Sequence, residues 1–460
     1  MSGGNGTSGE RGSMANGGRI EKEIPDFAQP PDVGVLRNPP FLRLWIAQLL
    51  TQIGGNVVLY GLTVLVAERN HDASALSLLF LSFLAPAVIL SPIAGVWVDR
   101  LDKRLVLIVA NLSRAIAFFL MLGSADALPT VLGLNILASI MTTIFSPAEL
   151  AMIPLIVHRE QLVSANGLFT FTLNAAFAIG FALLGPAVVR IAGPEASIIF
   201  VATLFLAAGL LCVGLPSAPP SRSESGIIGT TRETSRTTTA ELVEGLRYIY
   251  DHGSVVWSLL YLAIAASVVG VMGVLGPEYV SSALGLSPRD FWLVVLPIGL
   301  GVVTGILVLN SWGKAITRRL LIELGLFGVG AGLALLALAQ PISAAISDGA
   351  TQLGGLPLST AASAFATVIF IAYFAGAAYG LVAIPAQTAL QEDLPPEVRG
   401  RVFGVLNMLV SLGSFVPIVA VGPISDAVGA TNTLLGVGVF ILLVAILSLF
   451  RRPRQGAARN

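Results

Sequence analysis

Two charged side chains stand inside long apolar runs of this sequence. Arg114 lies about ten residues into one run, which places it about 15 Å from the nearer helix end. Glu149 lies about nine residues before His158, and therefore at a similar depth if the following helix continues through Pro147 and Pro154. Ionisable groups inside membrane helices are costly, rare and typically functional. We therefore expect Arg114 and Glu149 to pair with each other, either as a static structural pair or as part of a gate or proton-linked step.

Two other carboxyl groups need separate interpretation. Glu278 follows a Gly-Pro break near the end of an apolar run, so it either faces a cavity as a proton-coupling group or belongs to a solvated loop. Glu323 comes four residues after Arg319. This is the spacing of an ordinary ion pair on a helix surface, and it predicts a structural role for Glu323.

Uncharged polar residues are candidates for a substrate cavity. Gln48, Gln52 and Asn56 recur every four residues and therefore share one helix face. Further candidates are Asn135, Asn174, Tyr373 and Gln387. Hydrogen bonds between packed helices are the alternative role for each of them. A largely apolar cavity without an obligatory charge suits hydrophobic or amphipathic cargo better than a sugar phosphate.

The composition defines a membrane protein. Hydrophobic residues make up 55% of the chain and charged residues 11%, whereas a soluble domain carries roughly 25% charged residues. The formal net charge is +0, which gives no case for a nucleic-acid partner, and no Gly-x4-Gly-Lys run is present to hold nucleotide phosphates.

Metal, redox and catalytic centres are equally unsupported. The single cysteine, Cys212, excludes an internal disulfide and is expected to be a small buried hydrophobe. The histidines have no His or Cys neighbour at ligand spacing, so we expect neither a metal nor a cofactor. No cluster of catalytic residue types suggests an enzyme.

The fold class follows from counting apolar runs of about 20 residues, the length that crosses a bilayer. Twelve such runs occur, six before a polar gap and six after it. They lie at 41–67, 75–98, 105–123, 128–148, 163–190, 195–215, 255–281, 289–310, 319–340, 360–389, 401–424 and 430–450. This pattern predicts an all-α integral membrane protein with twelve transmembrane helices in two pseudo-symmetric six-helix bundles.

Composition also divides the chain into segments. We predict, in order, a disordered cytoplasmic N-terminal tail (1–38), an N-terminal six-helix bundle (39–215), a cytoplasmic linker with an amphipathic helix (216–253), a C-terminal six-helix bundle (254–450) and a basic cytoplasmic tail (451–460). The small and polar residues 347–358 predict a longer external loop.

The orientation follows from the basic residues. With both termini cytoplasmic, about 22 of the 26 Lys and Arg residues lie on the cytoplasmic side, as the positive-inside rule requires. We therefore expect a multi-pass protein of the cell (inner) membrane with both termini in the cytoplasm, and we expect it to be a monomer.

The loop between the second and third runs carries a recognisable motif, GVWVDRLDKR. Together with the six-plus-six division it resembles the major facilitator superfamily, whose signature there is Gly-x3-Asp-Arg-x-Gly-Arg-Arg. The match covers Gly95, Asp99, Arg100 and Arg104, while Asp102 stands where the family usually has Gly.

The resemblance implies a conformational latch. In that family the aspartate contacts the N-terminus of the eleventh span and holds the cytoplasmic side closed. By this resemblance Asp99, Arg100 and Arg104 would meet Gly400 and Arg401. A helix N-terminus favours an anion by about 0.3 to 1 kcal/mol when exposed, enough to bias a two-state equilibrium.

Other phrases resemble the branch that contains macrolide and enterobactin exporters, over nearly the whole chain after Arg37. In the fifth span, Gly180, Gly185 and Pro186 partly match the Gly-x3-Gly-Pro motif of proton-driven exporters, which makes a kinked, closely packed helix; shaping of an ordinary membrane helix is the alternative.

The resemblance therefore implies a secondary transporter that works by alternating access and exports a hydrophobic or amphipathic small molecule, drug- or siderophore-like, in exchange for protons. Its expected partners are the lipid bilayer, the small-molecule substrate and protons. An importer or lipid transporter of the same fold is the nearest alternative, and a membrane enzyme or receptor is disfavoured.

Overall fold

The computed structural model describes residues 34–70, 72–219, 253–312, 316–352, 360–393 and 396–450. Every regular element within these ranges is a helix. Twelve helical spans are long and apolar enough to cross a membrane. The twelve-span, all-α prediction is therefore confirmed.

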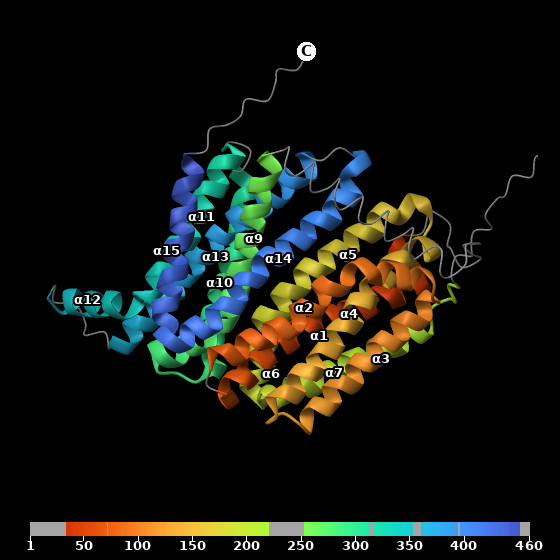
Figure 1. Ribbon diagram of the computed structural model, residues 1–460, viewed down its shortest axis with the longest axis horizontal. Coiled ribbons are helices and arrows are strands. Elements are labelled where there is room, and N and C mark those ends of the chain that lie inside the picture. The colour runs from red at the N-terminus through yellow and green to blue at the C-terminus, as the bar shows by residue number, and fades with distance from the viewer. Residues whose placement is uncertain are drawn as a thin grey trace, which may run out of the picture.

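Two groups of helices follow each other along the chain. The N-terminal half contains η1 (Val35–Arg37), α1 (Pro39–Asn70), α2 (Ala73–Asp99), α3 (Lys103–Leu122), α4 (Leu128–Ile156), η2 (Arg159–Gln161), α5 (Leu162–Phe177), η3 (Ala178–Leu184), α6 (Gly185–Ala192) and α7 (Pro194–Val213). The C-terminal half contains α9 (Gly253–Leu284), η4 (Pro288–Phe291), α10 (Trp292–Trp312), α11 (Arg318–Ala337), α12 (Ala339–Gln352), α13 (Thr360–Asp393), α14 (Pro396–Val428) and α15 (Ala430–Leu449). Figure 1 shows the first half in red to yellow and the second in green to blue.

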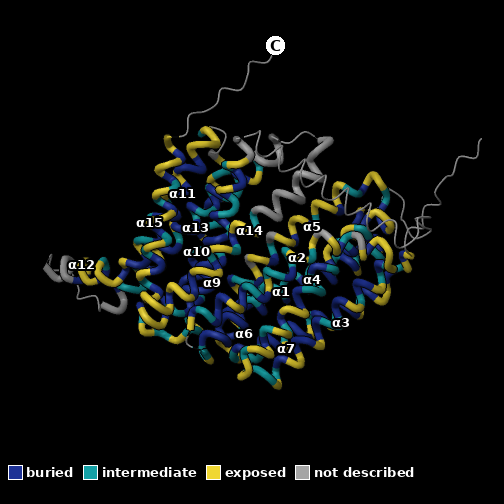
Figure 2. The backbone as a smooth tube through the Cα atoms, in the orientation of Figure 1, coloured by how far each residue is buried: buried dark blue, intermediate teal, exposed yellow. Residues whose placement is uncertain are grey.

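Each half is held together by helix-on-helix packing. In the N-terminal half, α7 packs against α1 and α3, and α4 packs against α2 and α3. In the C-terminal half, α13 packs against α10 and α11, and α15 packs against α11. The exposed residues include many large apolar side chains, and Figure 2 shows exposed positions along the outer faces of the helices. Such outward apolar surface is what a bilayer requires.

The fifth span is not a regular α-helix. Its middle part, η3, is a π-helix that joins α5 to α6. A Cβ added at Gly180 would lie 2.7 Å from the Cβ of Asn56 and 3.0 Å from the carbonyl oxygen of Ile53. Glycine at this position therefore lets η3 lie directly against α1. Gly185 and Pro186 begin α6 directly after the π-helix, so the proline without an N–H lies where the hydrogen-bond pattern changes.

The two halves meet at one end of the molecule, which we name the Asn70 end because α1 ends there and α2 begins there. The opposite end, where α2 gives way to α3, is the Asp99 end. Between residues that the structure describes on both sides, the hydrogen bonds across the halves join positions 60–77 to Arg289, Ile418 and Asp426. In Figure 1, α14 runs beside α2 where the halves adjoin, and the two helices pack on each other.

Two segment predictions need adjustment. Val35–Arg37 already form a 3-10 turn, and Asn38 is buried and donates a hydrogen bond to the carbonyl of Ile156 at 2.7 Å. The folded part thus begins before the expected boundary at residue 38. Positions 347–352, expected in a loop, belong to helix α12, which extends sideways from the bundle in Figure 1. The expected linker helix and the basic C-terminal tail lie outside the described residues.

Candidate functional site

Arg114 is buried in the middle of the N-terminal half, with 3% of its surface exposed. Its guanidinium donates hydrogen bonds to Oδ1 of Asn111 at 2.7 Å and to Oγ1 of Thr142 at 3.3 Å, and its Nε donates to the carbonyl of Ala110 at 3.2 Å. The guanidinium carbon also lies 4.6 Å from the ring centroid of Phe145 and 4.5 Å from that of Phe205. Neutral acceptors and aromatic faces therefore hold this cation.

Glu149 on α4 is 5% exposed, and its Oε1 has no hydrogen-bond partner. No ion pair joins it to Arg114 within the part of the chain that the structure describes, although the two charges are near enough to interact electrostatically. The expected direct pair is thus wrong for this conformation. The guanidinium instead directs hydrogen bonds to Asn111 and Thr142 and lies against two aromatic rings.

Two further polar groups lie in the same layer. Cys212 of α7 is buried, accepts a weak hydrogen bond from Asn111 at 3.7 Å, and interacts electrostatically with both Arg114 and Glu149. Gln48 of α1 is 1% exposed, and its Oε1 is also without a partner. Buried polar atoms normally find partners, so Gln48 and Glu149, each with an unpartnered oxygen, are candidates for a functional role.

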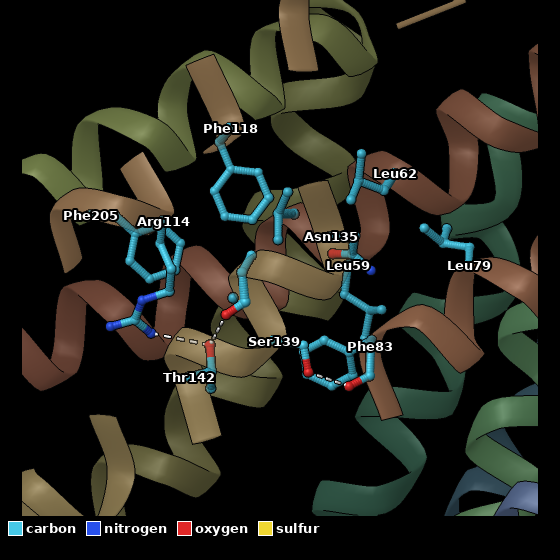
Figure 3. Close-up of a pocket in the computed structure, with 13 residues that line it drawn as sticks. Leu59, Leu62, Leu79, Phe83, Arg114, Phe118, Asn135, Ser139, Thr142 and Phe205 are labelled. Carbon is cyan, nitrogen blue, oxygen red and sulfur yellow. Dashed lines mark hydrogen bonds between the residues drawn. The ribbon is translucent and has the colours of Figure 1, made fainter. Parts of the chain in front are cut away.

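A cavity of about 30 Å³ opens between α1, α2, α3, α4 and α7. It is large enough for about two water molecules. Figure 3 shows its lining, in which Arg114, Asn135, Ser139 and Thr142 face a wall of aliphatic and aromatic side chains. The cavity therefore lies inside the N-terminal half, with its polar side on α3 and α4.

The proposed substrate residues are not gathered at one place. Asn135 lines the internal cavity and donates to Oγ of Ser82 at 2.8 Å. Asn56 donates to the carbonyl of Gln52 at 2.8 Å, within its own helix. The Tyr373 hydroxyl donates to Oγ1 of Thr304 at 2.9 Å in the C-terminal half.

The other two polar candidates add little to a site. Gln387 is exposed on α13. The side chain of Asn174 lies outside the described residues. The α1 trio is therefore the best-placed set from the polar pattern, because Gln48 is buried and Gln52 and Asn56 are partly buried along one face.

The closed Asn70 end is built from charged and polar groups. The carboxylate of Asp426 accepts hydrogen bonds from the backbone N–H of Ala73 at 2.8 Å and of Ser74 at 3.1 Å. Beside it, Ser425 donates to Oε2 of Glu278 at 2.9 Å. Glu278 is therefore a half-buried member of this contact region, and it is near enough to Asp426 to interact with it.

An ion pair adds to the same closure. Arg289 of η4 lies 2.6 Å from Glu68 of α1 through its Nε, and its Nη2 also donates to the second carboxylate oxygen at 3.2 Å. The backbone carbonyl of Arg289 accepts a hydrogen bond from the hydroxyl of Tyr60 at 3.3 Å. Helices α1, α2 and α14 and the 3-10 turn η4 thus carry the hydrogen bonds and the ion pair between the halves here.

At the Asp99 end, the motif loop is anchored to its own half. Asp102 caps α3 by accepting from the N–H of Arg104 at 2.9 Å, and Oγ of Ser217 donates to the same carboxylate at 2.5 Å. Arg104 donates to the carbonyl of Val213 at 2.5 Å, and Lys103 donates to that of Asp99 at 3.2 Å. The loop is therefore pinned to the segment that follows α7.

The Asp102 carboxyl has a pKa below its ordinary value of 3.8. Partial burial opposes this shift, but hydrogen bonds from Ser217, from Ala218 and from two N–H groups of the first turn of α3 outweigh it. The residue that replaces the usual family glycine is thus a strong helix cap.

The expected latch partners are only partly visible. Asp99 is exposed at the end of α2, and its carboxylate forms no hydrogen bond or ion pair with the residues that the structure describes. No heavy atom lies within 4 Å of a Cβ built at Gly95. Gly400 and Arg401 belong to the first part of α14, whose side chains lie outside the description. The latch stays a prediction, together with the role of Arg100.

The Arg319–Glu323 ion pair is confirmed, with 2.6 Å between Nε and Oε1. In contrast, sequence reasoning missed Ser139 and Thr142, although both follow Asn135 at helical spacing and this signal was available. It also missed Asp426, because a contact between residues 353 positions apart leaves no local pattern.

The twelve helical spans in two halves form the fold of the membrane transporters that the chain matches, which are transporters rather than enzymes. The chain belongs to the Major Facilitator Superfamily, whose family model matches residues 44–418. The resemblance expected from the loop motif is thereby confirmed.

Named relatives are similar over most of their length. The chain is 22% identical to the multidrug efflux pump Tap of Mycolicibacterium fortuitum, over 89% of this chain and 95% of that protein. It is 24% identical to macrolide efflux protein A of Streptococcus pyogenes, over 88% of this chain and 94% of that protein. A crystal structure of a mutant of the nucleoside transporter NupG matches with a TM-score of 0.67 and 13% identity, over 89% of this chain and 100% of that one, which shows a shared fold.

Proposed function

We propose that this protein exports a hydrophobic or amphipathic small molecule, drug-like or siderophore-like, in exchange for protons and by alternating access. The observation that carries the proposal is the position of the bonds between the halves, which gather at the Asn70 end. A transporter that opens alternately to each side needs contacts at one end that can be exchanged for contacts at the other.

Three features support export coupled to protons. The relatives Tap and macrolide efflux protein A are named efflux proteins. The buried carboxyl of Glu149 lacks a hydrogen-bond partner for Oε1. The cavity candidates of α1, Gln48, Gln52 and Asn56, are uncharged, which suits apolar cargo. Glu278 is the second carboxyl that we assign to this function, at the closed Asn70 end.

We also propose the orientation of the protein in the membrane and the residue limits of its two helix bundles. The Asp99 end and both termini face the cytoplasm of a bacterial cell, in its inner membrane, because basic residues concentrate there. The bundles extend over residues 39–215 and 254–450, and the chain works as a monomer. Asp99, Arg100 and Arg104 would bind the start of α14 at Gly400 and Arg401 when the Asp99 end closes.

The test is accumulation of lipophilic dyes and macrolide antibiotics in bacterial cells that express the wild type, Asp99→Asn or no transporter. We expect lower accumulation with the wild type, loss of this difference when a protonophore is added, and a weaker effect of Asp99→Asn. Efflux that persists after the proton gradient collapses would contradict proton coupling, and higher accumulation with the wild type would show import.

A further inference from the structure

The face of α4 that carries Glu149 is polar over much of its length. Asn135, Ser139, Thr142 and Glu149 fall within an arc of about 80° when each residue turns the helix by about 100°. At 1.5 Å per residue, the stripe from Asn135 to Glu149 is about 21 Å long. It runs from the outer third of the helix, near the Asn70 end, towards the Asp99 end. We name these four residues the α4 stripe.

The α4 stripe points into the N-terminal half instead of towards lipid. Asn135 and Glu149 are each 5% exposed and Ser139 is 2% exposed. Polar residues so deep in a membrane bundle pair with one another or mark an ion pathway. Ser146, on the same face between Thr142 and Glu149, is exposed, so the stripe reaches the accessible surface near its inner end.

The internal cavity lies directly on the outer part of the stripe. Asn135, Ser139, Thr142 and Arg114 all line it. The hydroxyls of Ser139 and Thr142 donate to backbone carbonyls at 2.5 and 2.9 Å. The Ser139 oxygen keeps both lone pairs as acceptors, and the Thr142 oxygen keeps one beside the hydrogen bond that it accepts from Arg114. About two waters fit the volume, and a buried water needs two to four polar partners, which this wall supplies.

Glu149, at the inner end of the stripe, has the surroundings of a carboxyl that carries a proton. An ionised carboxylate buried without a partner costs several kcal/mol. Oε1 of Glu149 has no donor, and the guanidinium of Arg114 is bound to Asn111 and Thr142 instead. Thr142 thus connects Arg114 to the stripe, and the cation is near enough to change partners.

We propose that the α4 stripe is a proton path that leads from the Asn70 end through the internal cavity to Glu149, and that Arg114 is the cation that pairs with Glu149 when its proton leaves. A proton carried by water binds the carboxylate and leaves neutral water; the reverse step gives the proton to the Asp99 end. This inference rests on the proposed proton coupling and names the site at which it occurs.

The remaining charges around α4 do not compete for this role. Arg114 and Cys212 are the titratable groups that interact electrostatically with Glu149. Among the helices packed on α4, the sequence of α5 has no charged residue and that of α2 has only its last residue, Asp99. The other charged residues of α3, Lys103 and Arg104, stand in its first turn and donate to the carbonyls of Asp99 and Val213. The charged residues of α1 stand near its two ends, at Arg43, Glu68 and Arg69.

The first test uses purified protein in liposomes, with ethidium as the lipophilic probe and the membrane potential clamped by potassium and valinomycin. Two rates are measured: ethidium movement driven by a pH gradient, and exchange of labelled for unlabelled ethidium without a gradient. We expect Glu149→Gln to lose the driven movement and to keep the exchange. Glu160→Gln, which changes an exposed carboxyl beyond the end of α4, is the matched control and should keep both.

Other residues of the stripe separate a proton path from a structural role. Thr142→Val removes a hydroxyl with little change in volume, so we expect slower driven movement and unchanged exchange. Driven movement at the wild-type rate in Glu149→Gln would overturn the proposal. Loss of both rates in a Glu149→Gln protein that unfolds at the wild-type temperature would also overturn it. If Glu149→Gln does not fold, Thr142→Val takes its place: driven movement at the wild-type rate in this variant would overturn the proposal.

A second readout does not depend on transport. The infrared difference between wild type and Glu149→Gln at neutral pH should contain the carbonyl stretch of a protonated carboxylic acid, which shifts on exchange into D₂O. Its absence would refute a protonated Glu149 even if transport is proton-driven. If the carbonyl stretch is present but the protein moves no ethidium, the protonated Glu149 is supported and the proposed export is rejected for this probe.

Discussion

Asp426, near the end of α14, caps the first turn of α2 in the other half of the molecule. Its two carboxylate oxygens accept the N–H groups of Ala73 and Ser74 at 2.8 and 3.1 Å. Asp72 holds the N-cap position of α2, but its side chain makes no capping hydrogen bond. A helix end that is normally capped within its own chain segment is therefore capped across the two halves, and it must lose that cap when they separate.

Removing this cap should open the Asn70 end. Asp426→Ala deletes acceptors whose loss at a helix N-terminus costs about 1 kcal/mol, which corresponds to about a fivefold shift towards the open state. Spin labels at Thr130 and Asn432, both exposed at this end, report the separation of the halves in a Cys212→Ser background. Asp72→Ala is the control and should leave the distance distribution unchanged. An unchanged distribution in Asp426→Ala would show that the cap does not hold the closure.

The Glu68–Arg289 pair should contribute more weakly. Both side chains are partly exposed, 20% and 48%, and exposed ion pairs are typically worth about 0 to 1 kcal/mol. We expect Arg289→Glu to widen the Thr130–Asn432 distance because it sets two like charges against each other. The double variant Glu68→Arg with Arg289→Glu should restore the wild-type distribution at low salt. Failure of the double variant to restore it would mean that the backbone contact with Tyr60, and not charge, holds this corner.

Asp102 should make the stability of the protein depend on acidic pH. Its folded-state pKa lies below the ordinary value of 3.8, so the ionised group stabilises the fold above that value, and the contribution is lost as the pH falls through the folded-state pKa. Asparagine caps helices about as well as aspartate, so Asp102→Asn removes mainly the ionisation. Thermal unfolding in detergent, followed below about pH 4, should fall less steeply for Asp102→Asn than for wild type. Parallel pH profiles would refute this role.

Two glycines of the fifth span should respond differently to the same substitution. Gly180→Ala places a methyl group against Asn56 and the carbonyl of Ile53, and overpacking of this kind costs about 1 to 3 kcal/mol. Gly167→Ala meets nothing within 4 Å and gains helix propensity, so it should be neutral or slightly stabilising. Thermal unfolding of both variants in detergent checks this. Equal midpoints would show that α1 and η3 move apart without cost.

The length of apolar runs was enough to predict the twelve spans, because a bilayer imposes a minimum helix length. It was not enough to predict the π-helix at 178–184, since run length carries no information about which hydrogen-bond pattern a helix adopts where it packs against α1. Run length also failed to separate α11 from α12. The helix is interrupted at Leu338, which is itself apolar and lies within an apolar stretch.

The buried charges show the same limit at the site. The number of residues between each charge and its helix end predicted that Arg114 and Glu149 lie near each other. Their electrostatic interaction agrees with this prediction. It did not reveal that Asn111 and Thr142 compete for the guanidinium, because that choice depends on side-chain geometry across α3 and α4. The spacing of Asn135, Ser139 and Thr142 could be recognised in the sequence as one helix face. Only the structure shows that this face lines a cavity.

Alternating access requires the halves to exchange closure at the Asn70 end for closure at the Asp99 end. The most direct measurement is a pair of spin-label distances in nanodiscs, Thr130–Asn432 at the first end and Glu160–Phe450 at the second, as ethidium is added and the pH is lowered. All four positions are exposed. We expect opposite changes, in which the first distance lengthens while the second shortens. Two distances that stay fixed, or that change in the same direction, would contradict alternating access.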